Sequence, residues 1–257
     1  LKINRLYNQK YLSNELLLNK EKLLSTLPEL RIQTKYIASG SEELDKLLIQ
    51  GIPQNYPIIL TAPFCDERDL IIKQFLEKGL TGDGIVFYIC SEISGIEDQI
   101  QNNPLKFYVF ICNPQGDMFI KDMSNVFKMK KGIMNLTEIN IALSSAIKKI
   151  QDSIDSPKRI CVNIISDVLL QHHAIKTKNW LTGLISELKN QGFTTLAVMN
   201  PLMHSTQDVH AILGLFDGEI ALEEKKTTRG SHKYLKINRM YNQDYLNNQV
   251  QIKKKKS

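Results

Sequence analysis

The strongest constraint on the fold is a regular alternation, beginning after Pro28, between short apolar runs and longer amphipathic stretches. The apolar runs have the length of buried strands, and the stretches between them have the periodicity of helices, which is typical of βαβ units. Such units place their strands parallel in one sheet and cover both of its faces with helices. The sequence therefore predicts a three-layer α/β domain with a mostly parallel central sheet, although the pattern does not give the order of the strands.

The strands and helices can be assigned individually from this pattern. The expected strands are Pro57–Thr61, Ile85–Cys90, Phe107–Cys112, Arg159–Ile165, Thr194–Met199, Gly218–Leu222 and Tyr234–Arg239. The expected helices are Glu42–Ile49, Asp66–Lys78, Ile96–Asn102, Leu136–Ser153, Lys178–Asn190 and Thr206–Leu215. The helix that begins at Leu136 has the clearest apolar stripe, because its leucines and isoleucines follow steps of three and four residues.

Length and composition exclude several classes of protein. The 257 residues, 42% of them hydrophobic, suffice for one domain with a well-buried core. No apolar run reaches the roughly 18 to 20 residues of a membrane helix, and the chain does not start with a secretory signal pattern. We therefore expect a cytoplasmic protein without membrane association.

The cysteines do not form a metal-binding or disulfide pattern. Cys65, Cys90, Cys112 and Cys161 lie far apart, and three of them fall in strand-like runs. No C-x-x-C pair occurs, so buried reduced thiols are favoured over a metal site or disulfides. We expect no metal site.

The formal net charge of +6 owes much to four consecutive lysines, Lys253–Lys256. Such a run is typical of a solvated tail, and residues 251–257 are interpreted as one. Nucleic-acid binding through the basic charge is an alternative that ranks low, because no aromatic-rich basic stripe accompanies the tail.

An internal repeat links the two ends of the chain. Residues 1–12 read LKINRLYNQKYL and residues 235–246 read LKINRMYNQDYL, identical at ten of twelve positions and 234 residues apart. The repeat is either a short duplicated element or the end of a preceding domain copy, and the domain-length spacing and missing initiator methionine favour the second. Residues 1–12 are then the last strand of that copy, residues 13–36 a connector and residues 37–250 the domain.

One segment gives a family resemblance. Residues 39–53 read SGSEELDKLLIQGIP, which resembles the S-G-x-x-x-L-D-x-L-L-x-x-G-I-P segment that precedes the first core strand of KaiC-like ATPases in the RecA superfamily. The resemblance continues to about Tyr245. It implies a RecA-like fold with a phosphate-binding loop after Pro57–Thr61, and a partner that is a second subunit or a tandem KaiC-like domain.

The loop at that position lacks the residues that a phosphate-binding loop uses. Glycines let backbone amides surround a phosphate, a lysine reaches the outer phosphates, and a Ser or Thr hydroxyl binds magnesium. The loop consists of Ala62, Pro63, Phe64, Cys65, Asp66, Glu67, Arg68 and Asp69. Against the family pattern G-x-x-x-x-G-K-T, Ala62 and Glu67 replace the glycines, Arg68 the lysine and Asp69 the threonine.

The acidic residues of this loop oppose a bound triphosphate. Each carboxylate close to a phosphate costs on the order of 1 kcal/mol or more in a partly buried site. We therefore expect a vacated nucleotide site that holds neither ATP nor magnesium. The alternative is that Arg68 alone binds a phosphate as a bidentate donor.

Three further positions are assigned by the resemblance. Asn163 stands where the family has the magnesium-binding aspartate, and a neutral amide coordinates magnesium weakly. Glu92 fits the glutamate that polarises the attacking water, although a helix cap or a surface carboxylate is an equal interpretation. Arg239 matches the first residue of a K-x-R pair that reaches a neighbouring subunit's phosphate, while Tyr241 replaces the second.

These assignments predict a non-catalytic RecA/KaiC-like domain that acts as a regulatory or oligomeric scaffold, in signal transduction, with an unidentified protein partner and without a cofactor. Two alternatives remain open. One is an atypical ATPase that uses Arg68 and Glu92, and the other is a DNA-binding relative of the recombinases.

Overall fold

The computed structural model describes residues 35–93, 95–115, 123–151, 156–227 and 230–252. Residues 1–12, nearly all of the predicted connector and Lys253–Lys256 lie outside this part of the chain. The fold therefore does not test the predictions made for these residues.

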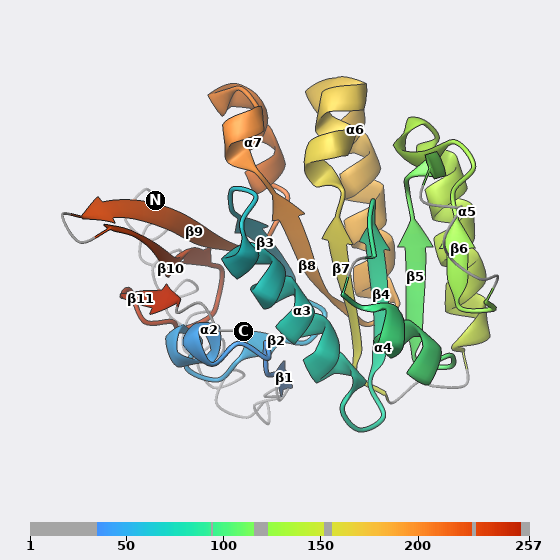
Figure 1. The fold of residues 1–257 in the computed structure, drawn as a ribbon, viewed down its shortest axis with the longest axis horizontal. Helices are drawn as coiled ribbons and strands as arrows, with labels where there is room; N and C mark the ends of the chain where they lie inside the picture. The colour runs from blue at the N-terminus through green and yellow to red at the C-terminus, as the bar shows by residue number, and fades with distance from the viewer. Residues whose placement is uncertain (1–34, 94, 116–122, 152–155, 228–229, 253–257) are drawn as a thin grey trace, which may run out of the picture. The chain divides into compact units, whose positions relative to one another are not determined.

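A nine-stranded sheet forms the centre of the domain (Figure 1). Its strands are β3 (Pro57–Thr61), β4 (Ile85–Cys90), β5 (Phe107–Ile111), β6 (Val126–Lys128), β7 (Lys158–Asn163), β8 (Phe193–Met199), β9 (Gly218–Thr227), β10 (Gly230–Met240) and β11 (Gln249–Ile252). Their order in the sheet is β11-β10-β9-β3-β8-β7-β4-β5-β6. The strands from β9 to β6 are parallel, and β10 and β11 continue the sheet as an antiparallel hairpin.

Helices cover both faces of this sheet, which confirms the predicted three-layer α/β fold. They are α2 (Glu42–Leu47), α3 (Asp66–Leu80), α4 (Glu97–Asn102), α5 (Leu136–Lys149), α6 (Ile165–Asn190) and α7 (Thr206–Leu213). Two 3-10 turns, η2 (Gly132–Met134) and η3 (Pro201–Met203), and a separate pair of two-residue strands, β1 (Tyr36–Ile37) and β2 (Ile52–Pro53), complete the described elements.

Side-chain alternation along the strands divides the core into two layers. Ile59 and Phe87 pack with α5, α6 and α7, whereas their neighbours Ile58, Leu60 and Val86 pack with α2, α3 and α4. Because both faces are buried, the strands carry continuous apolar runs rather than a polar and apolar alternation. This double burial explains why the runs were visible in the sequence.

The first glycine of the SGSEELDKLLIQGIP segment, Gly40, is required by its close approach to α3. Gly40 has a φ of +92°, and a Cβ atom there would lie 2.2 Å from the carbonyl oxygen of Gln74. The adjacent Ser39 donates its backbone N–H to Asp45 Oδ1 at 2.8 Å. Leu44, only 2% exposed, fixes the segment in the core. The residues that carry the family resemblance thus join α2 to α3.

The largest difference from the expected elements concerns α6. It begins at Ile165, well before the expected start at Lys178. The expected strand Arg159–Ile165 therefore ends earlier, at Asn163, and Ile164 and Ile165 are the N-cap and the first residue of α6. Ile164 and Ile165 are apolar because they are buried in the core, not because they are extended. His173, with a φ of 59°, kinks the helix, so the polar stretch around it resembles a loop in sequence.

The parallel strands give the sheet one edge at which all of their carboxyl ends meet. Ligands of open α/β sheets bind outside these ends, at points where the strand order reverses. The order places β3 next to β8, and β7 between β8 and β4. The loops that follow these strands are therefore the place for a functional site.

Candidate functional site

A cavity of about 420 Å³ lies at the carboxyl ends of β7 and β4, beside the first turns of α3. The structure brings together here five of the candidate residues, namely Asp66, Arg68, Asp69, Glu92 and Asn163. The pairing of β7 with β4 explains why residues from the ends of these two strands lie together, because Asn163 at the end of β7 lies opposite Cys90 at the end of β4. Ala62, Pro63, Phe64, Cys65, Glu67 and Arg239 do not line the cavity.

The backbone of the loop between β3 and α3 does not form a phosphate nest. The N–H of Ala62 donates to the carbonyl oxygen of Met199 at 3.0 Å, so the sheet uses this amide. No residue from Ala62 to Asp69 has a positive φ, and Cys65, the residue before α3, is extended at a φ of −166°. An anion-binding nest needs successive amides in alternating right- and left-handed conformations.

The guanidinium of Arg68 is held by its own neighbours. Arg68 is only 9% exposed, and it donates Nε and Nη2 to Asp69 Oδ1 at 2.8 and 2.5 Å. Its guanidinium carbon also lies 4.4 Å from the centre of the Phe64 ring. The ion pair and the aromatic contact neutralise and orient the one arginine of the loop.

Acidic residues occupy the amino terminus of α3. Asp66, Glu67 and Asp69 all fall in its first turn, where the free backbone N–H groups and the helix dipole favour negative charge. Glu67 is only 6% exposed. The positive end of the helix, which would attract a phosphate, thus already has carboxylates beside it.

The end of β7 makes a polar contact inside the cavity. Asn163 donates its side-chain amide to the hydroxyl of Tyr88 at 3.2 Å. Burial raises the pKa of Tyr88 well above its usual value, so the phenol stays neutral. Glu92, two residues past β4, lies at the exposed rim of the cavity. The cavity therefore holds one carboxylate in the position expected of a catalytic base and a neutral amide in the position expected of a metal ligand.

Arg239 lies at the other end of the sheet. Its neighbour Met240 pairs with Gly218, the first residue of β9, which marks the amino end of the parallel strands. The guanidinium donates Nη2 to the carbonyl oxygens of Leu213 and Phe216 at 2.9 and 3.1 Å. Arg239 therefore caps the carboxyl end of α7 in its own domain. Its contact with a neighbouring subunit stays a prediction.

Comparison with known families decides the classification. Residues 37–253 match a family model described as the KaiC ATPase. The chain belongs to the KaiC ATPase family. A solved KaiC-like protein from the hyperthermophilic archaeon Pyrococcus horikoshii OT3 has the same fold, with a TM-score of 0.62 and 15% sequence identity over 85% of this chain and 94% of that chain. No curated protein matches the chain.

Two polar side chains of this KaiC-family cavity, those of Tyr88 and Lys73, were not expected from the sequence. Tyr88 lies on β4 two residues before Cys90 and so on the same face of the strand, the face that packs against α3. Lys73 follows Asp69 by four residues on α3, which places both on one side of the helix. Strand alternation and helix periodicity from the recognised positions are the signals that identify both residues.

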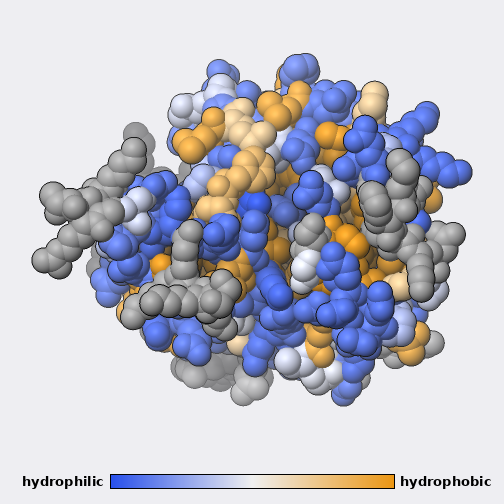
Figure 2. Space-filling model, viewed as in Figure 1, coloured by the Kyte–Doolittle hydropathy of each residue, from blue (hydrophilic) through white to orange (hydrophobic). Residues whose placement is uncertain are grey.

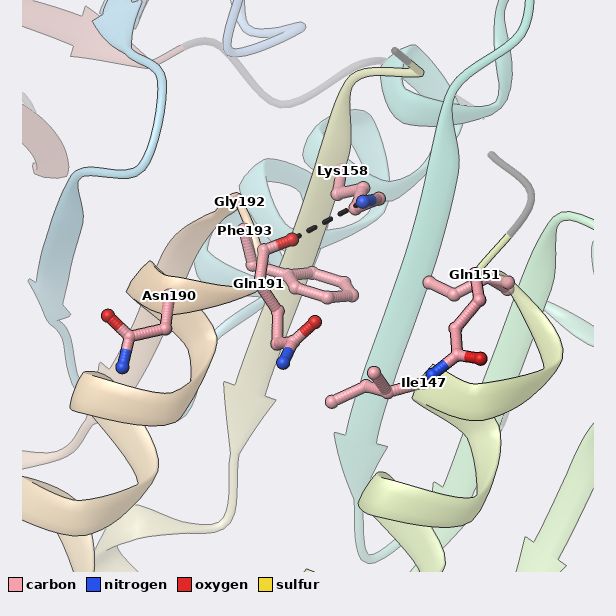
Figure 3. A pocket seen from close by; sticks show the side chains of 8 residues that line it. Ile147, Gln151, Lys158, Asn190, Gln191, Gly192 and Phe193 are labelled. Carbon is pink, nitrogen blue, oxygen red and sulfur yellow. Dashed lines mark hydrogen bonds between the residues drawn. The ribbon is translucent and has the colours of Figure 1, made fainter. Parts of the chain in front are cut away.

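A second hollow lies at the opposite end of the sheet (Figure 3). It has a volume of about 350 Å³, and its only charged residue, Lys158, donates to the carbonyl oxygen of Gln191 at 3.4 Å. None of the candidate residues lines it. The candidate site of this KaiC-family domain is therefore the cavity beside α3.

The described residues contain no group of three or more His, Cys, Asp and Glu side chains placed to hold a metal ion. Within the same residues, no helix is both long and apolar enough to cross a membrane.

The cysteines give a first testable prediction. Cys90, Cys112 and Cys161 are buried, whereas Cys65 is partly exposed. Burial raises the pKa of Cys112 to about 12, and it raises the pKa of Cys90, Cys161 and Cys65 as well, so exposure is what distinguishes Cys65 from the other three. Because the thiolate is the reactive form, the native protein at pH 8 should react with DTNB at Cys65 alone. Peptide mapping after the reaction identifies the labelled residue, and rapid labelling of Cys90, Cys112 or Cys161 would contradict the packing.

Proposed function

We propose that this KaiC-family domain is a non-catalytic module, which neither holds nor hydrolyses ATP and acts as a regulatory or scaffolding partner of like domains in signal transduction. The state of the β3–α3 loop carries the proposal. Its first amide is bonded to β8 through Ala62, its arginine is bonded to Asp69, and its helix terminus carries three carboxylates. A triphosphate in this loop would meet negative charge instead of a cradle of amides.

The cavity wall across from the loop supports the same proposal. The position expected to bind magnesium is the amide of Asn163, which donates to Tyr88. A neutral amide contributes one weak oxygen ligand, while magnesium in nucleotide sites is held by carboxylates and phosphates. With both the phosphate and the metal contacts altered, Glu92 has no bound nucleotide on which to act.

The surface near this edge supports a role in association. Phe64, Leu202, Leu170 and Ile175 are all more than half exposed, and they belong to the loops and helices that follow β3, β8 and β7. Figure 2 shows apolar surface gathered toward the end of the molecule at which the parallel strands end. Contiguous exposed apolar surface is typical of contact sites for other proteins.

Titration with magnesium-ATP tests the proposal. We expect no heat of binding up to about 1 mM nucleotide by calorimetry, and no phosphate release above the blank, because the loop offers no phosphate contacts. Sedimentation of the same sample should show self-association. Micromolar binding with turnover would contradict the proposal.

One observation favours the alternative of an atypical ATPase, because Arg68 and Glu92 do line the same cavity. If phosphate release is observed, Arg68→Ala and Glu92→Gln should each abolish it, whereas Lys189→Ala, far from this cavity on α6, should leave it unchanged. Turnover that survives the first two substitutions would place the activity elsewhere or in a contaminant.

A further inference from the structure

A third cavity, with a volume of about 490 Å³, opens at the carboxyl ends of β4 and β5. Its walls include Ser91 after β4, Cys112 after β5 and Asp167 in the first turn of α6. Cys112 belongs to the core layer that contains α5, α6 and α7, whereas Tyr88 and Ile96, which line the cavity beside α3, belong to the other layer. The two cavities therefore lie on opposite faces of the sheet.

The walls of this third cavity are held together by contacts of the chain itself. Gly132 has a φ of +53°, and a Cβ atom there would lie 2.6 Å from the carbonyl oxygen of Cys112. The turn that carries Lys131 therefore lies directly against the end of β5. On the other side, Nε2 of His172 lies 2.7 Å from the carbonyl oxygen of Ile133 and joins α6 to the same turn. The fold thus forms the cavity without a ligand, as is usual for small-molecule sites.

The cavity contains one acid and one base. Among the described residues that line it, Asp167 is the only carboxylate and Lys131 the only ammonium group. Asp167 accepts a hydrogen bond at Oδ2 from the hydroxyl of Ser91 at 3.1 Å, and it forms no ion pair with a described residue. Lys131 makes its hydrogen bonds through its backbone, so its ammonium group has no partner in the described part of the chain. Both charges are therefore available to a ligand.

Apolar side chains form much of the remaining wall. Ile133 and Met134 come from η2, Leu170 comes from α6, and Pro114 comes from the loop after β5. Met134 and Leu170 are 66% and 53% exposed, so an apolar group placed against them removes apolar surface from water. A volume of about 300–1,000 Å³, a largely apolar wall and a few polar groups that fix orientation are typical of small-molecule sites.

We propose that this cavity binds a small zwitterion with an apolar side chain, either a free α-amino acid or a dipeptide. The ammonium group of the ligand pairs with Asp167 and its carboxylate pairs with Lys131, while its side chain packs on Met134 and Leu170. Hydrogen bonds between charged groups are the strong ones, and the two opposite charges fix the direction in which the ligand lies. The proposal does not depend on whether the cavity beside α3 binds ATP.

Calorimetric titration of the full chain in the absence of nucleotide tests the proposal. The probes are L-leucine, L-methionine, L-phenylalanine and the dipeptide L-leucyl-L-leucine. We expect at least one of them to bind with a dissociation constant below about 1 mM. Tighter binding of the dipeptide than of L-leucine identifies a peptide as the ligand, and the reverse order identifies a free amino acid. If none of the four binds below about 1 mM, the proposal is wrong.

Two analogues and two variants connect each charge of the ligand to one residue. L-leucinamide lacks the carboxylate, and N-acetyl-L-leucine lacks the ammonium group. Lys131→Met should weaken the binding of L-leucine at least about tenfold and leave that of L-leucinamide unchanged. Asp167→Asn should weaken the binding of L-leucine as strongly and leave that of N-acetyl-L-leucine unchanged. Ligand-observed NMR measures the weaker complexes.

Matched control variants change the same kinds of charge outside the cavity. Lys130→Met removes an exposed lysine next to Lys131, and Asp208→Asn removes a carboxylate from the first turn of α7. Neither residue lines the cavity, so both variants should bind L-leucine like the wild type. Equal losses of affinity in Lys130→Met and Lys131→Met would overturn the proposal, because overall charge rather than the cavity would then govern binding.

Urea unfolding of each variant separates loss of the ligand contact from loss of the fold. Lys131 is exposed, so Lys131→Met should keep the urea midpoint of the wild type. Asp167→Asn keeps an oxygen that can accept from Ser91. If its midpoint nevertheless falls, the comparison of L-leucine with L-leucinamide on Lys131→Met still decides, and an equal loss of affinity for both ligands would contradict the proposed pairing.

Discussion

Replacement of Phe87 by alanine should lower the free energy of unfolding by about 3–5 kcal/mol, because it empties the centre of the larger core layer. Phe87 is fully buried on β4. Its ring centre lies 4.8 Å from that of Phe193, 5.2 Å from that of Tyr108 and 5.5 Å from that of Phe110, all in tilted geometry. Domains of this size are stable by about 5–15 kcal/mol, so the substitution removes a large part of the total.

Urea unfolding at 25 °C measures this loss, and Phe64→Ala serves as the matched control. Phe64 is 62% exposed, and its main contact is with the guanidinium of Arg68. Its replacement should therefore change the free energy of unfolding by less than about 1 kcal/mol. A loss below about 1.5 kcal/mol for Phe87→Ala would mean that the aromatic cluster is looser than described.

Restoration of the family pattern in the loop should create a magnesium-ATP site beside α3. The loop from Ala62 to Asp69 has the same length as the family pattern, so no insertion is needed. The substitutions Ala62→Gly, Glu67→Gly, Arg68→Lys and Asp69→Thr, with Asn163→Asp on β7, return the pattern of glycines, lysine, hydroxyl and acid. They also remove two carboxylates from the first turn of α3 and release the position of Arg68 from its ion pair with Asp69.

We expect this fivefold variant to bind magnesium-ATP with a dissociation constant near 10 µM, at least about 100-fold tighter than the natural chain, as measured by calorimetry. A variant with the same changes but with alanine at position 68 is the matched control, and it should bind far more weakly because the outer phosphates lose their lysine. If the fivefold variant folds and still does not bind, the loop residues are not what prevents nucleotide binding.

The central strands were predictable because strands that are buried on both faces appear in the sequence as continuous apolar runs. The ends of β3 and β4 were predicted to the residue, since each is a fully buried run of mostly apolar residues. β6 was not expected, because it has only three residues, all of them half-buried. β11 was missed for a similar reason, since only Ile252 of its four residues is buried. Edge strands of this kind lack the continuous apolar run that identifies a central strand.

The start of α6 and the strand order depend on contacts between distant residues. Ile164 and Ile165 have the same apolar character in a strand or in a buried helical turn, and the choice is made by their packing in the core. Likewise, the sequence predicted that the ends of β3, β4 and β7 carry site residues, but only the order β8-β7-β4 shows that Asn163 and Glu92 share one cavity. Tyr88 enters the site through this neighbour relation as well.

The contacts of Gly40 affect how relatives of this chain should be classified. A side chain at this position would collide with the backbone of α3, so the fold requires glycine here whether or not the neighbouring loop binds a nucleotide. The carboxylate of Asp45 likewise serves the scaffold, because it accepts a hydrogen bond from the backbone N–H of Ser39. Recognition of a homologue by these residues therefore measures common descent of the framework, and enzymatic competence has to be judged separately, from the eight residues that follow β3.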